Sequence, residues 1–572
     1  MSWPQTLERR FMNVESNIEL ENYLKTRGKV ILNACPGGGK TTAIALKIAL
    51  LETEIADTRG KFSGIACLSF TNAAKDEIND KYREVNEKSL NFPNLVSTID
   101  SFINRYITLP YYYLMGRNYK RPKILEDNKR VNKLFVRYYK DAKGITQEAL
   151  KDDIKEFKTL NGQILYHKYK PEKIRLEPDG SYTWNGKIPD LNVVNPEVFT
   201  NYCKYIKRVQ FEEGLITTND SAYCAYYILV KYPKIAKWLT SRFPCIIIDE
   251  AQDNSLLQHK IFECLTQAGL NHIEFIGDPY QSLYEWRDAD PQLFINKCED
   301  TTYTNLPFTG NRRSPKHIIN CFSLMRPIKE RTIKYIGNEK KIEPILVYRF
   351  GNNDRTEIVK HFERKCKDSK YLKRKIVVRG NEKLNELIGR NAIQEPWHER
   401  EAYAIIRICI EFEDRNLKEA INLARRIVID VVNPKMTYSD RANLRSEIST
   451  DYKFNAGLID FIEGLPSLNL TVKEWTEKTE KYLEDVLELD YSFDLKLKKR
   501  ASSKVSKETF DDPVSKHFKR VNVDEISTIT TVHQVKGKTL DAILVLFDEK
   551  NHGSNINFKD LEPDRKGFLK EK

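Results

Sequence analysis

The chain has 572 residues, too many for a single hydrophobic core, and this length predicts roughly three to five domains. Its content of 40% hydrophobic and 11% aromatic residues is ample for folded domains, and no apolar run reaches the ~18 residues that a membrane-spanning helix needs. The formal net charge of +13 favours a polyanionic partner, but charge alone leaves this open, because many basic proteins bind none.

The ten cysteines lie far apart in the sequence, without a C-x-x-C pair or any spacing typical of metal ligands. Cysteines scattered in this way are typical of small buried hydrophobic side chains in a reducing compartment. The first 13 residues lack the apolar core of a secretory signal. We therefore expect a cytoplasmic protein that does not bind membranes.

The first predicted elements are an apolar strand at 30–32, a glycine-rich turn and an apolar helix at 42–51. From Ile31 the sequence reads I-L-N-A-C-P-G-G-G-K-T-T. This composition is typical of a phosphate-binding loop, because glycines let backbone N–H groups close around phosphate oxygens. The alternative, a glycine-rich surface loop, is disfavoured by the flanking strand and helix. The residues expected to bind nucleotide are Ala34, Cys35, Pro36, Gly37, Gly38, Gly39, Lys40, Thr41 and Thr42.

Two residues of this loop have expected chemical roles. Lys40 would reach the β- and γ-phosphates, and the Thr41 hydroxyl would complete the shell of a Mg²⁺ ion held mainly by water and phosphate. Ala34 stands where the usual G-x-x-x-x-G-K-[ST] pattern has its first glycine. An alanine there costs little, because the later glycines form the tight turn.

Strands and helices alternate along the next part of the chain. Residues 64–70 and 95–98 are predicted strands, and a helix is expected to begin at Thr71 or Asn72. This alternation favours an α/β fold with a parallel sheet covered by helices on both faces.

The pattern changes at residue 106. Up to about residue 221, tyrosines and charges predict a mainly helical insertion with a small hairpin or irregular portion around 179–187. Residues 117–140 hold nine Lys or Arg against two acids, interleaved with aromatic residues. Such a mixture suits single-stranded nucleic acid, although a solvated helix face has a similar composition.

The sheet resumes at residue 244 with P-C-I-I-I-D-E-A-Q-D. Three isoleucines predict a strand buried on both faces, and the acidic pair falls at its carboxyl end, where open α/β sheets bind ligands. Asp249 would hold Mg²⁺ through water, and Glu250 would orient or deprotonate an attacking water. A buried strand can end in Asp-Glu by chance, but the presence of Lys40 in a P-loop favours nucleotide hydrolysis.

These motifs together resemble superfamily 1 DNA helicases of the UvrD, PcrA and Rep type, and the resemblance continues in order along the chain. Residues 69–78 (S-F-T-N-A-A-K-D-E-I) are similar to motif Ia of that family, and 97–102 (S-T-I-D-S-F) to the motif after it. Residues 276–289 (I-G-D-P-Y-Q-S-L-Y-E-W-R-D-A) are similar to motif III. Residues 311–314 (N-R-R-S) resemble motif IV, and 531–540 (T-V-H-Q-V-K-G-K-T-L) resemble motif V.

The resemblance implies ATP and Mg²⁺ as cofactors and adds two candidate catalytic residues to Glu250. Gln281 would sense the γ-phosphate, and Arg313 would be an arginine finger supplied by the second motor domain. Arg312 stands where the family has a tyrosine that stacks on adenine, and a guanidinium plane can also stack. The family's adenine-reading glutamine has no clear counterpart, since the comparable region carries Glu19, so the nucleotide preference stays open.

The resemblance also implies a path for single-stranded DNA. Tyr284 and Trp286 would stack on bases just beyond motif III. A Tyr-x-Trp pair is more often core packing in general, but its place after Gln-Ser in this setting favours stacking. The residues implied to contact DNA are Phe70, Thr71, Asn72, Tyr284, Trp286 and His533.

The implied architecture is two RecA-like P-loop motor domains, each with a mainly helical inserted domain, and ATP between the motors. We expect the first motor at 1–104 and 222–298 with its insertion at 105–221. The second motor is expected at 299–390 and 521–572 with its insertion at 391–520. Residues 551–572 contain no counterpart of the family's motif VI, so we expect an incomplete chain rather than a natural pseudo-enzyme.

Two functions fit this pattern. The first is an ATP-dependent DNA helicase or translocase that moves 3′ to 5′ on single-stranded DNA, or on a duplex with a single-stranded tail. The alternative is a DNA-end or nucleotide sensor that does not unwind and acts with a nuclease subunit. Residues 536–542 (K-G-K-T-L-D-A) resemble helicase-like subunits of Gabija-type anti-phage systems.

Overall fold

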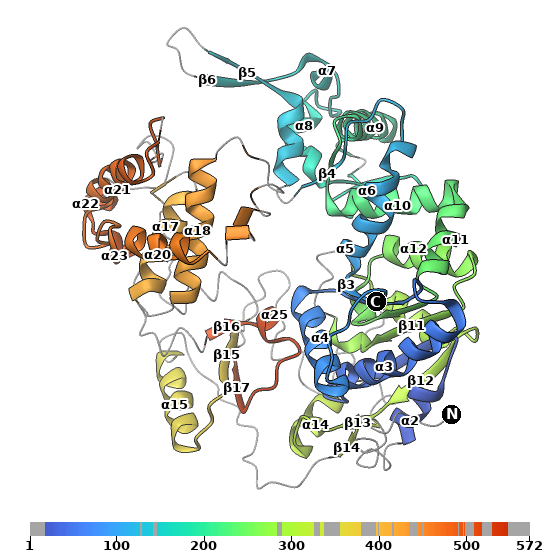
Figure 1. Ribbon diagram of the computed structural model, residues 1–572. Helices are drawn as coiled ribbons and strands as arrows, with labels where there is room; N and C mark the ends of the chain where they lie inside the picture. The colour runs from blue at the N-terminus through green and yellow to red at the C-terminus, as the bar shows by residue number, and fades with distance from the viewer. Residues whose placement is uncertain are drawn as a thin grey trace. The chain divides into compact units, whose positions relative to one another are not determined.

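The computed structural model describes the chain in two compact units (Figure 1). The first consists of the described residues up to 336, and the second of those from 355 to 546. Each unit has a sheet and hydrophobic cores of its own. The described residues are 18–125, 128–140, 146–190, 192–282, 289–324, 326, 332–336, 355–378, 396–397, 400–413, 417–433, 436, 441, 444–445, 447–448, 451–489, 491–495, 497, 508–517 and 529–546.

The first unit is built on a six-stranded sheet of order β12-β1-β11-β10-β2-β3, in which every neighbouring pair is parallel. The central strands are apolar and buried on both faces, as parallel sheets require. The predicted α/β fold is therefore confirmed. The strands are β1 (Lys29–Ala34), β2 (Ile65–Ser69), β3 (Leu95–Thr98), β10 (Cys245–Ile248), β11 (His272–Gly277) and β12 (Thr304–Phe308).

Helices cover both faces of this sheet (Figure 1). Alternate strand residues point to opposite faces, so β10 gives Ile247 to one core and Ile246 and Ile248 to the other. No helix in the described part of the chain is both long and apolar enough to cross a membrane. One face carries α2 (Ile18–Lys25), α3 (Lys40–Arg59) and α4 (Asn72–Asn86), and the other carries α5 (Ile99–Ile103), α10 (Thr218–Lys231), α11 (Pro233–Arg242), α12 (Leu256–Gln267) and α13 (Pro291–Glu299).

Strand β12 lies beyond residue 298, where the sequence predicts the end of the first motor. It nevertheless pairs with β1 along its length, with Val30 opposite Thr304 and Ala34 opposite Phe308. The sequence pattern misses β12 because it is a partly exposed edge strand that contains Pro307. The first sheet therefore extends past the predicted boundary. The chain continues into β13 (Gly310–Asn311), which pairs with β14 (Lys334–Tyr335), and into α14 (Lys316–Ser323).

The insertion after α5 has its own core, which includes Phe135, Leu165 and Tyr202. Its described residues include two antiparallel strand pairs. The β7–β8 hairpin overlaps the one predicted around 179–187, whereas the β5–β6 hairpin is an addition to the mainly helical expectation. The elements are α6 (Leu109–Tyr111), β4 (Lys123–Ile124), β5 (Val136–Lys140), β6 (Thr146–Leu150), α7 (Asp152–Lys155), α8 (Leu165–Lys168), β7 (Ile174–Leu176), β8 (Tyr182–Trp184), α9 (Pro196–Glu212) and β9 (Leu215–Ile216).

The second unit contains a three-stranded parallel sheet of order β16-β15-β17. Strand β15 precedes a helical region in the chain, and β16 and β17 follow it. That region is organised around the buried side chains of Trp397 and Trp475. The elements are α15 (Arg355–Asp368), β15 (Arg374–Val378), α17 (Arg400–Glu413), α18 (Leu417–Val432), α20 (Tyr452–Glu463), α21 (Val472–Val486), α22 (Glu508–Asp511), α23 (Val514–His517), β16 (Ile529–Thr531), α25 (Val532–Val535) and β17 (Ala542–Val545).

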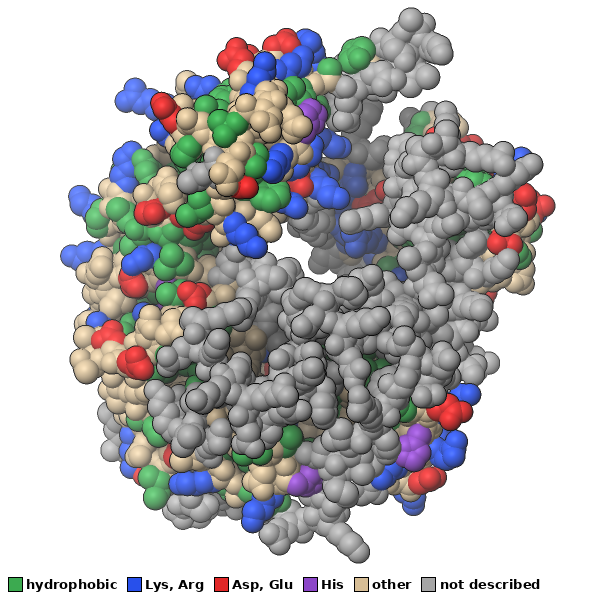
Figure 2. All heavy atoms as spheres, turned by 180° about the vertical axis from the view of Figure 1, so that it is seen from behind, with side chains coloured by type: hydrophobic (Ala, Val, Ile, Leu, Met, Phe, Trp, Pro, Cys, Tyr) green, Lys and Arg blue, Asp and Glu red, His purple; other side chains and the backbone are tan. Residues whose placement is uncertain are grey.

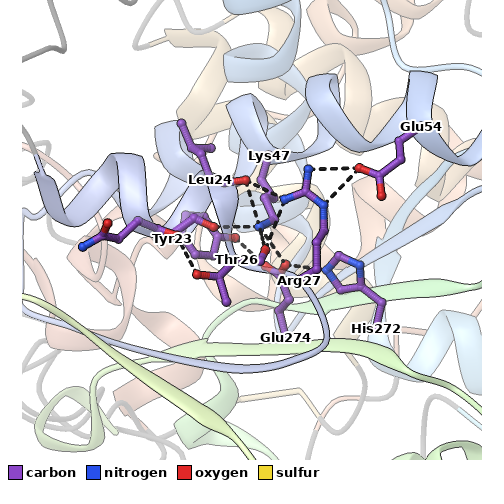
Figure 3. A network of polar contacts seen from close by, with 9 residues as sticks. Tyr23, Leu24, Thr26, Arg27, Lys47, Glu54, His272 and Glu274 are labelled. Carbon is purple, nitrogen blue, oxygen red and sulfur yellow. Dashed lines mark hydrogen bonds and ion pairs between the residues drawn. The ribbon is translucent and has the colours of Figure 1, made fainter. Parts of the chain in front are cut away.

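A buried polar network ties α2 and α3 to β11 (Figure 3). The Lys47 ammonium lies 3.4 Å from the Glu274 carboxylate and donates to the carbonyl oxygens of Tyr23, Leu24 and Thr26 at the end of α2. The Tyr23 hydroxyl donates to the Glu274 carboxylate (2.6 Å). The His272 ring contacts the same carboxylate at 2.7 Å. Burial alone would raise the pKa of Glu274, but Lys47, His272 and Tyr23 outweigh it and lower that pKa. The buried charge of Glu274 is therefore compensated by the groups that surround it.

We predict that Lys47→Met destabilises the first unit by about 3–5 kcal/mol, because it leaves Glu274 charged and buried without its cation. Urea unfolding, with hydrogen exchange of peptides from α2 and α3, measures the loss. The control is Lys81→Met, which removes an exposed pair with Glu84 and should cost less than about 1 kcal/mol. Equal losses in the two variants would contradict a structural role for the buried pair.

Candidate functional site

The glycine-rich loop connects β1 to α3 at the carboxyl edge of the first sheet. Gly39 is the N-cap of α3 with φ of +91°, a left-handed conformation that glycine adopts without strain. Gly37 also has a positive φ (+69°), and a Cβ atom there would lie 2.6 Å from the Cβ atom of Arg313. The loop backbone is anchored by the Cys35 N–H, which donates to the Phe308 carbonyl at 2.9 Å. The loop thus turns tightly, with two glycines in the left-handed region.

The remaining loop residues lie at the end of β1 and at the start of α3. Ala34 is the last residue of β1, where its buried side chain is compatible with an extended backbone. The Thr41 hydroxyl, at the start of α3, donates to Glu77 at 3.3 Å, and the neighbouring Thr42 is exposed. Burial raises the pKa of the Cys35 thiol to about 11, so this residue stays protonated at neutral pH.

The acidic pair after β10 reaches the same edge. The Asp249 N–H donates to the Leu68 carbonyl at 2.8 Å, which continues the pairing of β10 with β2. Glu250 follows with φ of +52°, a conformation that bulky residues rarely adopt and that is concentrated at functional sites. Its carboxylate lies 3.9 Å from the Lys40 ammonium. The structure thus brings together a lysine and a carboxylate that are far apart in the sequence.

The charges at this edge are strongly coupled. Burial alone would lower the pKa of Lys40, but Glu250, Asp278 and Asp249 outweigh it and raise that pKa, so the ammonium stays charged. Burial, reinforced by the nearby Glu250 carboxylate, raises the pKa of Asp249. The protonation states of Lys40 and Asp249 therefore both depend on Glu250.

The side chains present fit a divalent cation. Asp249 is 5% exposed, and its Oδ1 atom has no hydrogen-bond partner within the described part of the chain. A buried carboxylate oxygen without a partner is costly, and Mg²⁺ prefers hard oxygen ligands of this kind. Asp249 and the Thr41 hydroxyl are the residues that would hold it.

Several polar residues beside Glu250 support it. Gln252 and Asp278 stand inside the quoted motifs without an assigned role, and Arg326 stands outside them. Gln252 is fully buried, and its amide donates to Glu250 (2.5 Å) and accepts from the Asp278 N–H (3.1 Å). Asp278 in turn accepts from Gln281 (2.7 Å) and from Arg326. These bonds link the end of β10 to the end of β11.

The arginine segment lies directly against the loop, in the first unit. The sequence predicts Arg313 on the second motor, but β12 belongs to the first sheet and carries the following residues with it. Asn311 donates to the Pro36 carbonyl (2.5 Å), and Arg312 donates through its N–H to Gly37 (3.1 Å) and through Nη1 to Gly38 (3.4 Å). Arg312 is thus engaged with the loop backbone.

Helix α2 holds this segment from the other side. The Glu19 carboxylate accepts from the N–H (2.8 Å) and from the hydroxyl (2.5 Å) of Thr309. Both carboxylate oxygens of Glu19 therefore accept hydrogen bonds from Thr309. Glu19 positions the arginine segment, a role that the sequence alone does not reveal.

The residues predicted to contact DNA are only partly described. Phe70, Thr71 and Asn72 follow β2 at the same carboxyl edge, where the Thr71 side chain caps α4 by accepting from the Ala74 N–H. Tyr284 and Trp286 lie outside the described residues. For His533 the structure describes only the backbone, which is part of α25 in the second unit.

The inserted region of the first unit presents a basic surface. Figure 2 shows many Lys and Arg side chains over the lobe that carries the β5–β6 hairpin. Several of them belong to the basic stretch at 117–140, in which Lys123, Lys129 and Arg137 are exposed. This surface fits the predicted polyanionic partner.

Comparison with known proteins agrees with this geometry. Residues 15–302, half of the chain, match the UvrD/REP helicase N-terminal domain. A probable DNA helicase II homolog of Mycoplasma capricolum is 23% identical over 380 residues, which are 64% of this chain and 47% of that protein. The ATP-dependent DNA helicase Rep of Buchnera aphidicola is 26% identical over 373 residues, 62% of this chain and 51% of that protein.

A third relative is the Gabija protein GajB of Bacillus cereus, 26% identical over 328 residues, 57% of this chain and 51% of that protein. The chain spans about half the length of these curated relatives. The order of the motifs, the shared carboxyl edge and the match over residues 15–302 lead to one conclusion. The chain belongs to the UvrD/REP helicase family.

Proposed function

We propose that the chain is the motor part of an ATP-dependent DNA helicase or translocase that moves 3′ to 5′ along single-stranded DNA. One observation carries this proposal: the Lys40 ammonium of the P-loop lies 3.9 Å from the Glu250 carboxylate. The neighbouring residue, Asp249, has a buried carboxylate oxygen without a partner among the described residues. The polarity rests on the family resemblance. We place this activity in the cytoplasm, where DNA and ATP are available together.

The nucleotide would bind with its phosphates against the loop amides and the Lys40 ammonium, whose charge is maintained by three carboxylates. Mg²⁺, held through Asp249 and Thr41, would neutralise charge on the phosphate oxygens. Glu250, oriented by Gln252, would accept a proton from the attacking water. Gln281 would sense the γ-phosphate, and Arg313 would neutralise charge developing on it.

The DNA strand would run past the residues that follow the neighbouring strand β2. Phe70, Thr71 and Asn72 begin where β2 ends, next to β10 in the sheet. A change at the phosphate site can therefore reach the DNA contacts through one pair of strands. Tyr284, Trp286 and His533 complete the proposed path.

A second candidate is a DNA-end or nucleotide sensor that acts with a nuclease subunit and does not unwind DNA. The observation that favours it is the similarity to the Gabija protein GajB. A strand-displacement assay with a 3′-tailed duplex separates the two. DNA-stimulated ATP hydrolysis with unwinding supports a motor, and nucleotide binding without either supports a sensor.

We predict that Lys40→Ala abolishes ATP hydrolysis, because it removes the cation that binds the β- and γ-phosphates, and leaves DNA binding largely intact. Phosphate release and the anisotropy of a labelled oligonucleotide measure the two properties. The control is Lys81→Ala, which removes an exposed lysine of α4. Retained hydrolysis in Lys40→Ala would refute the proposed site.

We predict that Gln252→Met lowers kcat for ATP about 10- to 100-fold and changes KM less than threefold. The P-loop is untouched, but Glu250 loses the amide that orients it. Gln210→Met is a matched control, because Gln210 is equally buried and also donates to a carboxylate, that of Asp220, inside the insertion. A similar fall in kcat in both variants would point to general destabilisation instead.

We predict that Mg²⁺ binds more tightly at pH 8 than at pH 6. Burial raises the pKa of Asp249, so a proton competes with the metal as the pH falls towards that pKa. Titration of Mg²⁺ at a fixed concentration of a fluorescent ATP analogue measures the affinity. Asp249→Asn should bind weakly with a flatter pH dependence, and an unchanged pH dependence in this variant would exclude Asp249 as the titrating ligand.

A further inference from the structure

We propose a second nucleic-acid site on the first unit, at the amino-terminal edge of the sheet. It is formed by two loops and one helix end, and its ligand is single-stranded nucleic acid. Phe62 precedes β2, Phe92 precedes β3, and Arg242 precedes β10. Since β10, β2 and β3 are neighbours in the sheet, their amino ends bring these residues together. The inference rests on the proposed action on DNA and adds a surface to it.

Hydrogen bonds and close packing fix the three segments to one another. The Gly64 N–H donates to the Arg242 carbonyl (3.0 Å), and the Ser63 hydroxyl donates to the Ser241 carbonyl (2.9 Å). The Arg242 guanidinium donates to the Pro93 carbonyl at 2.7 Å. Gly64 lies so close to Pro93 that a Cβ atom would meet its carbonyl oxygen at 2.4 Å. The surface is therefore preorganised.

Large aromatic side chains stand exposed on this surface. Phe62 and Phe92 are 65% and 69% exposed, with their ring centroids 6.3 Å apart, and Trp238 on α11 is 59% exposed. Trp238 is one helical turn before Arg242, so both side chains lie on the same face of α11. Arg242 in turn lies over the Phe92 ring at 5.1 Å. The Arg242 guanidinium also lies 4.2 Å from the centroid of the buried Phe243 ring, so it is held beside the exposed Phe92.

The charge around these rings is positive. Helix α11 carries Lys234, Lys237 and Arg242 and has no acidic residue. The Lys61 ammonium lies 5.4 Å from the centroid of the Phe62 ring. Exposed aromatic rings interleaved with cations are the composition that binds single strands, because bases stack on the rings and phosphates pair with the cations.

An acidic protein is the alternative ligand. It would complement the positive charge of this surface, but it fits the exposed aromatic rings less well. Arg242 lies over the Phe92 ring and Lys61 over the Phe62 ring, whereas protein interfaces concentrate their apolar contacts in a core depleted of charge. Rings at separate positions suit successive bases, which each present a π face. The observations therefore favour a nucleic-acid strand.

This surface is separate from the nucleotide site. The P-loop and Asp249 follow the carboxyl ends of their strands, whereas Phe62, Phe92 and Arg242 precede the amino ends. A strand of five residues such as β2 spans roughly 15 Å. Nucleic acid bound here would not compete with ATP, and this edge could hold a second length of the substrate strand.

The test is photocrosslinking of the full chain to a (dT)20 oligonucleotide that carries 5-iododeoxyuridine, followed by peptide mass spectrometry. We expect crosslinks at Trp238, Phe62 or Phe92. In Lys234→Ala/Lys237→Ala, their yield should fall about fivefold at 150 mM salt, because two phosphate contacts are lost. The matched control is Lys478→Ala/Lys481→Ala, an exposed pair with the same spacing on α21 of the second unit, which should leave the yield unchanged.

Crosslinks confined to Phe70 and its neighbours, or a yield that is equal in the two double variants, would overturn the proposal. Either result would favour an acidic protein as the partner of this surface. DNA-stimulated ATP hydrolysis, measured on the same wild-type preparation, reports on the proposed function separately. A chain that hydrolyses ATP without crosslinks at this edge refutes only the second site, and crosslinks there without hydrolysis refute only the motor.

Discussion

The parallel pairing of β1, β10 and β11 is the constraint on which the candidate site depends. Strands that run in the same direction bring their carboxyl ends to one edge of the sheet, so the residues that follow them meet there. Lys40, Glu250 and Asp278 are far apart in the sequence and close together for this reason. The same constraint brings the start of α4 to this edge, because β2 pairs with β10. The residues proposed to contact phosphate and those proposed to contact DNA therefore lie at the same edge of one sheet.

The first unit has two groups of buried charges, and they differ in how fully they are paired. Lys47 and Glu274 are buried, pair with each other, and bond to Tyr23 through its carbonyl and its hydroxyl, so they hold α2 and α3 in place. At the carboxyl edge, Asp249 keeps an unpartnered oxygen within the described structure, and Glu250 keeps a left-handed backbone. Unpaired charge and backbone strain persist only where the surroundings enforce them, and they gather at functional sites. This contrast distinguishes the site from the scaffold.

Much of this fold follows from local sequence patterns. The P-loop and the strand before Asp249 have strong signals, because glycine spacing and apolar runs reflect local geometry. Strand β12 has no such signal, since it is a half-exposed edge strand with a proline, and its pairing with β1 places Arg313 in the first unit. Glu19 and Arg326 depend on contacts with segments far from them in the sequence, which no single-sequence pattern encodes. Gln252 stands inside a quoted motif, but its bond to the Asp278 N–H on the neighbouring strand appears only in the structure. The roles of Tyr284, Trp286 and His533 stay predictions, because their side chains lie outside the described residues.

The most direct test of the central claim is an experimental structure of this chain with Mg²⁺ and a non-hydrolysable ATP analogue. We expect a triphosphate in the loop between β1 and α3, with its β- and γ-phosphates beside Lys40 and the metal next to Asp249 and Thr41. A nucleotide bound away from this loop, or a metal without contact to Asp249 even through water, would contradict the central claim.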